Sequence, residues 1–229
     1  MAEVYDCSNP TELLTGMRLA RQAIGRGELV VIPTDTVYGV AADAFSPDAV
    51  QRLLDAKGRG RTSPPPVLIP DEASLGALAE RVPEKVLDLV RAFWPGGLTV
   101  ILPQRQTLDW DIGETQGTVA LRVPKNPVAL ELLRETGPLA VSSANKTGAP
   151  AARTAADAQA MLGDSIAVYL NDGGAGTDYE QDSGRDSSTI VDAVRFSAGR
   201  GGLRIVRHGV ISDEAIRDVV GDALETDAT

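Results

Sequence analysis

The chain has 229 residues, of which 43% are hydrophobic and 24% are charged, and this composition is typical of a globular protein with one large domain or two small ones. The 22 lysines and arginines are outnumbered by 32 aspartates and glutamates, and a net charge of −10 argues against binding of duplex DNA, RNA or an anionic membrane through bulk electrostatics. A single cysteine excludes an intramolecular disulfide, and together with a single histidine it cannot form a structural zinc site.

The two ends of the chain and its domain organisation give further expectations. Residues 1–10 lack a basic segment followed by an apolar one, and no run reaches about 18 apolar residues, so we expect a cytoplasmic protein that does not enter a membrane. No linker divides the chain, and we expect one domain over residues 1–221. Residues 222–229 are polar, which predicts a flexible tail.

Helical and strand patterns alternate along most of the chain. Apolar periodicity and capping patterns predict helices at residues 10–26, 47–56, 83–94, 127–136 and 213–220, with a further helix starting at Thr154. Short apolar or alternating stretches predict strands at residues 28–32, 67–69, 98–102, 118–123, 138–141, 166–170, 188–191 and 203–206. This order predicts an α/β fold with a mixed sheet.

The first predicted strand, residues 28–32, leads directly into PTDTVYGVAA, residues 33–42. Because Pro33 cannot continue the strand ladder, we expect an open polar loop at the carboxyl end of a buried strand, where α/β sheets place their ligands. The polar side chains expected to project there are Thr34, Asp35, Thr36 and Tyr38. An ordinary turn between a strand and a loop remains the alternative for these ten residues.

Cationic and hydroxyl side chains come at the ends of later elements. The helix at 47–56 runs into KGRGR, residues 57–61, which forms either a solvated helix end or a clamp for phosphate or carboxylate. Alternation in residues 118–123 places Arg122 opposite Val119 and Leu121, on a face where an arginine needs an anion or solvent. Two hydroxyls and an amide follow another strand in SSAN, residues 142–145.

Four separate segments therefore supply anion-binding groups, which predicts one basic pocket for a substrate with several negative charges. These groups are Lys57 with Arg59, Arg122, Ser143 with Asn145, and Arg207. Neither the phosphate-binding loop of P-loop enzymes nor the dinucleotide-binding glycine motif occurs in the chain. We expect His208 at the surface, which argues against a catalytic triad.

Seven short motifs, in order, resemble the YrdC family of L-threonylcarbamoyladenylate synthases, from about residue 20 to 215. They are PTDTVYG (33–39), AKGRGR (56–61), FWPGGLT (93–99), TVALRVP (118–124), SSAN (142–145), DGG (172–174) paired with STIVD (188–192), and RIVRHG (204–209). A single motif of this length is weak evidence for membership of the family, whereas seven motifs in the same order along the chain are highly specific for it.

The resemblance implies a reaction in which L-threonine, bicarbonate and ATP give threonylcarbamoyl-AMP and pyrophosphate, the first step toward N6-threonylcarbamoyladenosine (t6A) in tRNA. It also implies a YrdC-type α/β fold, a twisted mixed sheet with flanking helices around a large, positively charged cavity, in the short form without a further C-terminal domain. The expected cofactor is Mg²⁺ bound with ATP. The adenylate is expected to pass to a downstream tRNA threonylcarbamoyl transferase complex, so that contact with tRNA is indirect or weak.

The resemblance also implies roles for individual residues. Lys57 and Arg59 are the implied catalytic pair, and Arg122 is expected to hold the threonine carboxylate. The implied threonine-binding residues are Thr34, Arg122 and Ser142. The implied ATP-binding residues are Lys57, Arg59, Thr118, Ser143, Asn145, Ser188 and Arg207. Magnesium is expected on the ATP phosphates, with Ser143 and Asn145 as candidate ligands.

The chain departs from the family pattern at Gly60 and Arg61 with the prolines at 64–66, at Leu68, at Gly97 and at residues 185–187. These departures affect the expected details of the phosphate clamp at residues 57–61. Two rival interpretations remain: a tRNA-binding module without synthase activity, and a carbamoyl-transfer domain of the hydrogenase-maturation kind. The net negative charge and an aromatic content of 4% argue against the first. The single cysteine argues against the second, because such domains accompany cysteine-rich segments.

Overall fold

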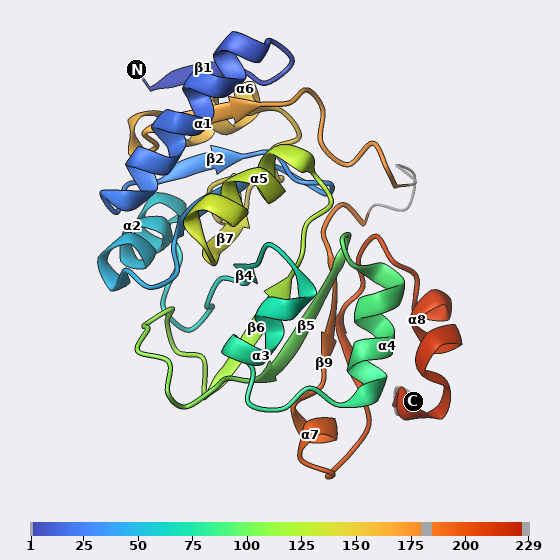
Figure 1. The fold of residues 1–229 in the computed structure, drawn as a ribbon. Helices are drawn as coiled ribbons and strands as arrows, with labels where there is room; N and C mark the ends of the chain where they lie inside the picture. The colour runs from blue at the N-terminus through green and yellow to red at the C-terminus, as the bar shows by residue number, and fades with distance from the viewer. Residues whose placement is uncertain (1, 180–184, 226–229) are drawn as a thin grey trace.

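The computed structural model describes residues 2–179 and 185–225, and ten strands in this part of the chain form one sheet (Figure 1). The strands are β1 (Glu3–Asp6), β2 (Val30–Ile32), β3 (Gly39–Asp43), β4 (Val67–Leu68), β5 (Leu98–Pro103), β6 (Thr118–Arg122), β7 (Leu139–Ser143), β8 (Val168–Asn171), β9 (Thr189–Asp192) and β10 (Arg204–Arg207). Their order across the sheet is β1-β8-β2-β3-β7-β4-β6-β5-β9-β10. The sheet contains parallel pairs such as β2 with β8 and antiparallel pairs such as β5 with β6, so the prediction of a mixed sheet is confirmed.

The six helices of eight or more residues in the described part of the chain follow the sequence prediction closely. The helices, with the two shorter ones included, are α1 (Pro10–Gly25), α2 (Pro47–Lys57), α3 (Leu75–Leu78), α4 (Glu84–Phe93), α5 (Pro127–Thr136), α6 (Ala155–Leu162), α7 (Val194–Ser197) and α8 (Asp213–Val220), with short 3₁₀ turns at Glu72–Ser74, Gly163–Ser165 and Gly221–Ala223. Within residues 2–179 and 185–225, none of the helices combines the length and apolar character that crossing a lipid bilayer requires.

Local capping explains why three of these helices begin where they do. Asn9, Ser46 and Asn126 each accept a hydrogen bond from a main-chain N–H of the first helical turn, and a proline follows each of them. A capping side chain of this kind stabilises a helix by about 1 kcal/mol, and proline presets the backbone angle of the first helical residue. The local sequence therefore determines where α1, α2 and α5 begin.

The two halves of the sheet bury their faces differently. In β2, Val30 and Ile32 pack on one face with residues of α1 and α5, whereas Val31 packs on the other face with residues of α2 and α6. In β5 and β6, one face packs with residues of α4 and α8 in a single hydrophobic cluster. The opposite face of β5 and β6 carries Thr99, Thr118 and Arg122, so this half of the sheet presents polar side chains toward the middle of the molecule.

The structure differs from the prediction at the segment 33–42. Residues 39–42 belong to β3, which pairs antiparallel with β2 and with β7, so the chain turns back immediately instead of forming an open loop. Strand β1 and the short helices α3 and α7 were also not expected. β1 lies at the edge of the sheet and pairs with β8, a contact between distant parts of the chain that a local pattern does not reveal.

The expected flexible tail is wrong for residues 222–225. Leu224 is 4% exposed and belongs to the hydrophobic cluster around α4 and α8. The N–H of Leu203 donates to the carbonyl of Ala223 at 2.7 Å, and the N–H of Glu225 donates to the carbonyl of Leu203 at 2.8 Å. The remaining tail residues, 226–229, lie outside the described part of the chain.

Candidate active site

The polar face of β5, β6 and β9 borders a cavity of about 260 Å³. Its other walls come from the turn after β2, from residues 64–68 and from the end of β7. Eight of the ten residues predicted for the site line this cavity: Thr34, Arg59, Thr118, Arg122, Ser142, Ser143, Ser188 and Arg207. The fold thus brings together segments that lie far apart in the sequence, while the individual roles of these residues stay predictions.

The other two predicted residues, Lys57 and Asn145, lie outside the described lining and bond to each other. The Lys57 ammonium donates to the main-chain carbonyl of Asn145 at 2.8 Å, to its side-chain Oδ1 at 3.0 Å, and to the carbonyl of Ser143. Lys57 comes from the last turn of α2 and is 3% exposed. The ammonium therefore fixes the backbone after β7 and, through it, the position of Ser143 in the cavity wall.

The surroundings of Lys57 shift its proton affinity toward neutrality. Burial, followed by the nearby charges of Arg59 and Lys146, lowers the pKa of Lys57 to about 8. An amine with such a pKa is present in both the charged and the neutral form near pH 8. The hydrogen bonds of the ammonium to Ser143 and Asn145 give Lys57 a structural role, and its predicted catalytic role stays a prediction.

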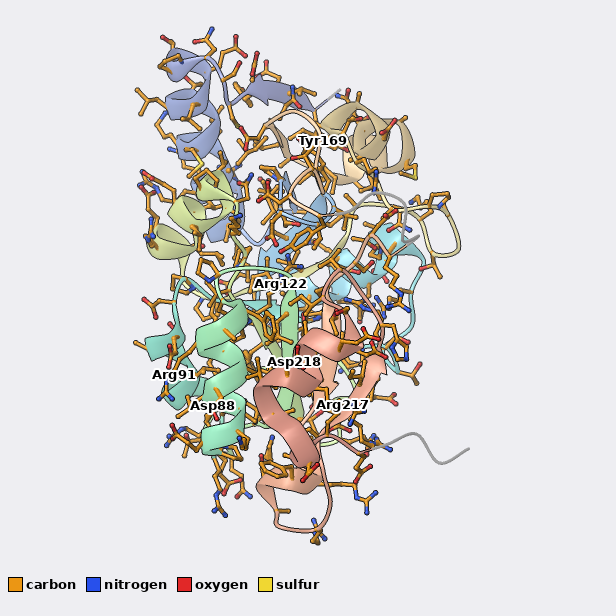
Figure 2. All side chains as sticks on the ribbon, turned by 90° about the vertical axis from the view of Figure 1, so that its right-hand side faces the viewer. Asp88, Arg91, Arg122, Tyr169, Arg217 and Asp218 are labelled. Atoms are coloured by element: carbon orange, nitrogen blue, oxygen red, sulfur yellow. The ribbon has the colours of Figure 1, made fainter. Side chains whose placement is uncertain are left out.

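Arg122 is held on three sides and lies in the middle of the molecule, whereas Arg91 lies on the outer helix α4 (Figure 2). Arg122 Nε donates to the carbonyl of Gly96 at 2.9 Å, and Nη1 donates to the hydroxyl of Thr36 at 3.0 Å. Nη2 lies 2.8 Å from Asp35 Oδ1. Among the described residues, however, none accepts a directed hydrogen bond from Nη2, so the contact with Asp35 is an ion pair without such a bond. The predicted placement of Arg122, opposite the buried face of β6, is confirmed.

Thr34 organises the turn that follows β2. Its hydroxyl accepts the main-chain N–H groups of Thr36 and Val37, each at 3.2 Å, and donates to the carbonyl of Val37 at 2.5 Å. These contacts use the one donor and the two acceptor positions of a threonine hydroxyl. Thr34 therefore lines the cavity with a hydroxyl that already has partners, and a ligand must share or displace them to bind it.

Arg207, at the end of β10, provides a second anchored guanidinium in the cavity lining. Its Nε donates to the carbonyl of Ser188 at 2.8 Å, and Nη2 donates to the Ser188 hydroxyl at 2.7 Å, which in turn pairs with the Thr99 hydroxyl at 2.7 Å. Arg207 as a whole is exposed at the end of β10, but partial burial of its guanidinium, followed by the charges of Arg122 and Arg59, lowers the pKa of Arg207 to about 10. The three guanidiniums thus repel one another across the cavity, and a bound anion relieves this repulsion. The overall sign of the potential in the cavity stays a prediction.

One wall of the cavity is apolar and is built from the segment that departs from the family pattern. Pro64, Pro65, Pro66, Leu68 and Ile112 line it. Leu68 is 3% exposed, and its side chain offers apolar contact area but no hydrogen bond. Of the departures noted in the sequence, the prolines at 64–66, Leu68 and Ser187 line the cavity, so they affect what packs against a ligand there.

The contacts of Asn145 do not fit direct coordination of magnesium. Asn145 Oδ1 accepts from the Lys57 ammonium at 3.0 Å and from the Ser143 hydroxyl, and Nδ2 donates to the carbonyls of Lys146 and Ala149. An ammonium in contact with the only suitable oxygen excludes a divalent cation from the same position. In the described part of the chain, no cluster of three or more His, Cys, Asp or Glu side chains can hold a metal ion. Magnesium on the ATP phosphates stays a prediction.

The cavity also contains residues that the sequence did not single out as binding residues. Thr99 is 1% exposed and completes the chain of hydroxyls that ends at Arg207. The alternation in residues 98–102 could have found it, because Thr99 stands opposite Leu98, Val100 and Leu102. Asp35 and Tyr179 do not belong to the cavity lining but meet next to Arg122. The sequence placed Asp35 after the first strand, whereas no sequence pattern links it to Tyr179, which lies 144 positions further along the chain.

A family model described as telomere recombination, Sua5/YciO/YrdC, matches residues 22–209. The chain belongs to the Sua5/YciO/YrdC family. The resemblance drawn from the seven motifs is therefore confirmed, and the YrdC-type fold with it.

Curated members of the family include close relatives over nearly the whole chain. A Mycobacterium tuberculosis protein, provisionally named threonylcarbamoyl-AMP synthase, is 46% identical over 221 residues, which are 96% of this chain and 96% of the relative. The Bacillus subtilis threonylcarbamoyl-AMP synthase is 36% identical over 204 residues, 88% of this chain and 56% of the longer relative. The alignment with the mycobacterial relative therefore spans nearly the full length of both proteins.

Solved structures of the family have the same fold. Pyrococcus abyssi Sua5 in a complex with L-threonine superposes with a TM-score of 0.81 at 28% identity, covering 97% of this chain and 61% of the other. Escherichia coli YciO superposes with a TM-score of 0.78 at 20% identity, covering 94% of this chain and 100% of the other, a likeness that concerns the fold alone.

Proposed function

We propose that this protein is a threonylcarbamoyl-AMP synthase, which converts L-threonine, bicarbonate and ATP into threonylcarbamoyl-AMP, pyrophosphate and water. The observation that carries the proposal is the convergence of Arg59, Arg122 and Arg207, with hydroxyl side chains between them, on one cavity. A triphosphate, a carboxylate and a carbamate together need several cationic groups in one place. The names of the full-length mycobacterial relative and of the Bacillus relative support the same reaction.

In this proposal each guanidinium has its own anion. Arg122 holds the threonine carboxylate, because its guanidinium belongs to the cavity lining and is anchored by the Gly96 carbonyl and the Thr36 hydroxyl. Arg59 and Arg207 hold phosphate oxygens, and Ser143, Ser188 and Thr118 donate or accept around the nucleotide. Thr34 and Ser142 complete the amino-acid side, with the Ser142 hydroxyl accepting from Arg59 at 3.2 Å.

Positioning and charge stabilisation provide the catalysis in this proposal. The threonine amine first attacks the carbon of bicarbonate, which forms the N–C bond of the carbamate and releases water. An oxygen of this carbamate then attacks the α-phosphorus of ATP, and the new O–P bond forms as the bond to the pyrophosphate leaving group breaks. Guanidiniums that are already oriented stabilise the negative charge that builds up on the phosphate without any rearrangement. Lys57 holds the wall after β7 and supplies positive charge behind it. Magnesium enters only as the counter-ion that accompanies ATP.

The test measures pyrophosphate from purified protein incubated with ATP, Mg²⁺ and bicarbonate, with and without L-threonine. We expect release that depends on threonine and that falls by about 10²-fold in Arg59→Ala, because a charge-stabilising donor is lost. Arg91→Ala is the matched control, since Arg91 is an exposed arginine of α4 that pairs with Glu84. Release that is absent from the wild-type protein, or that does not need threonine, contradicts the proposal.

The proposed function also implies partners that act after the synthase reaction. We expect the adenylate to pass to a tRNA threonylcarbamoyl transferase complex in the cytoplasm, and direct contact with tRNA to be weak. The rival function, a tRNA-binding module without synthase activity, predicts submicromolar, salt-sensitive tRNA binding without pyrophosphate release. A filter-binding assay at physiological salt beside the pyrophosphate assay separates the two.

A further inference from the structure

Arg207 reaches the cavity from the edge of the sheet. It is the last residue of β10, which stands at the end of the strand order and pairs with β9, with a shift of register between Ile205 and Arg207. The residue as a whole is exposed, yet it belongs to the cavity lining. An arginine side chain has many accessible rotamers, so its place on an edge strand does not by itself direct the guanidinium into the cavity.

Electrostatics oppose this inward orientation when no anion is bound. Partial burial, followed by the positive charges of Arg122 and Arg59, lowers the pKa of Arg207. Loss of hydration and repulsion from the other two guanidiniums both disfavour a cation at this place. A rotation of the side chain toward solvent relieves both costs, so the inward orientation depends on contacts that hold the guanidinium.

Ser188 supplies these contacts through two acceptors. Arg207 Nε donates to the main-chain carbonyl of Ser188 at 2.8 Å, and Nη2 donates to its hydroxyl at 2.7 Å. The carbonyl is part of a fixed main chain, because a Cβ atom on Gly209 would overlap the backbone of residues 187–189. The hydroxyl, in contrast, can rotate about the Cα–Cβ bond of Ser188 among three staggered positions. A further contact is therefore needed to keep it directed at Arg207.

Thr99 provides that contact from the interior of the sheet. Its Oγ1 atom lies 2.7 Å from Ser188 Oγ in a hydrogen bond. After accepting from Arg207, the Ser188 hydroxyl keeps one hydrogen and one lone pair, so either hydroxyl can be the donor. Thr99 lies on β5, between β6 and β9, and is 1% exposed. Its β-branched side chain has few accessible rotamers, so its hydroxyl is a rigid partner for Ser188.

We infer that Thr99 is a positioning residue for Arg207: it fixes the Ser188 hydroxyl, and this hydroxyl keeps the Arg207 guanidinium directed into the cavity. Without the Thr99 hydroxyl, Ser188 Oγ rotates away, Arg207 Nη2 loses its acceptor, and the guanidinium moves toward solvent. That Arg207 binds a phosphate of ATP rests on the proposed function, whereas the orientation of Arg207 does not.

Kinetics of three variants test the inference. Thr99→Val removes the hydroxyl and retains the branched shape, and we expect the KM for ATP to rise about 5- to 10-fold while the KM for L-threonine changes less than about 2-fold. Thr99→Ser restores the hydroxyl and should bring the KM for ATP back to within about 2-fold of the wild-type value. In an Arg207→Met background, Thr99→Val should alter the KM for ATP by less than about 2-fold, because Thr99 acts through Arg207.

Thr136→Val is the matched control. The hydroxyl of Thr136 donates to the carbonyl of Leu132 within α5 at 2.9 Å, and Thr136 lies outside the described cavity lining. Its removal should leave both KM values unchanged. The inference is overturned by an unchanged KM for ATP in Thr99→Val, by equal rises in Thr99→Val and Thr99→Ser, or by an equal effect of Thr99→Val in the Arg207→Met background.

Crystal structures of the wild-type protein and of Thr99→Val keep the inference testable if the protein does not turn over ATP. We expect Arg207 Nη2 to bond to Ser188 Oγ in the wild type and to have left it in the variant. The same contacts between Arg207 and Ser188 in both structures overturn the inference, whatever the activity. Thr99→Ala takes the place of Thr99→Val if the latter does not fold, with the same expected changes. Failure of the proposed function is recognised separately, by a wild-type protein that releases no pyrophosphate with threonine.

Discussion

Replacing Arg122 by lysine isolates what the guanidinium does beyond its charge. Arg122 is 6% exposed and lies beside the buried carboxylate of Asp35, so its positive charge is needed for folding. Lysine retains that charge. It loses the donor to the Gly96 carbonyl and the fork of N–H groups that can hold a substrate carboxylate on two oxygens.

The structure sets the size of the expected effect. One hydrogen bond to a charged group contributes about 1.5–3 kcal/mol, and each 1.4 kcal/mol corresponds to roughly tenfold in affinity. Loss of one bond to the carboxylate therefore raises the threonine KM about 10- to 100-fold in Arg122→Lys. Arg122→Ala, in contrast, leaves the Asp35 charge buried without its cation and lowers the free energy of unfolding by about 3–5 kcal/mol.

Pyrophosphate release as a function of threonine concentration measures the first effect, and urea unfolding measures the second. Arg91→Lys on α4 is the control, because Arg91 is exposed and its partner Glu84 lies at the surface. A threonine KM that stays at the wild-type value in a folded Arg122→Lys protein removes Arg122 from the amino-acid site. A rise in the KM for ATP alone assigns Arg122 to the nucleotide instead.

Three further outcomes are expected. Between pH 8 and 10.5 the unfolded chain holds a proton that folded Lys57 has lost, so we expect the free energy of unfolding to rise with pH by up to about 3 kcal/mol. Urea unfolding at several pH values should show a smaller rise in Lys57→Met than in the wild-type protein. An equal dependence of the unfolding free energy on pH in both proteins contradicts the shifted pKa. Asn145→Asp should leave the Mg²⁺ concentration for half-maximal pyrophosphate release unchanged, whereas a marked decrease places the metal at this side chain. Leu224→Ala should lower the free energy of unfolding by about 2–3 kcal/mol, because Leu224 is buried. Leu14→Ala, at a residue that is 74% exposed, should lower it by less than about 0.5 kcal/mol. Equal losses for the two variants in thermal or urea unfolding argue against packing of the chain end.

Much of the fold was predictable because its signals are local. The caps Asn9, Ser46 and Asn126 with their prolines mark the starts of α1, α2 and α5 within a few residues of sequence. The alternation in residues 118–123 was enough to place Arg122 away from the hydrophobic face of β6, because side chains of a strand alternate between its two faces. The family motifs added which segments belong to one site.

Tertiary structure alone decided how the site is assembled. The chain by itself determined the element types, the mixed sheet and the set of polar segments, since these depend on neighbours in sequence. It did not determine that residues 39–43 form a strand, that Lys57 lies behind the cavity wall, or that Tyr179 and Lys125 both donate to Asp35. Those features depend on contacts between residues far apart in the sequence. They also depend on burial, which shifts the pKa of a group such as Lys57. The contacts and the burial form only when the sheet folds around the cavity.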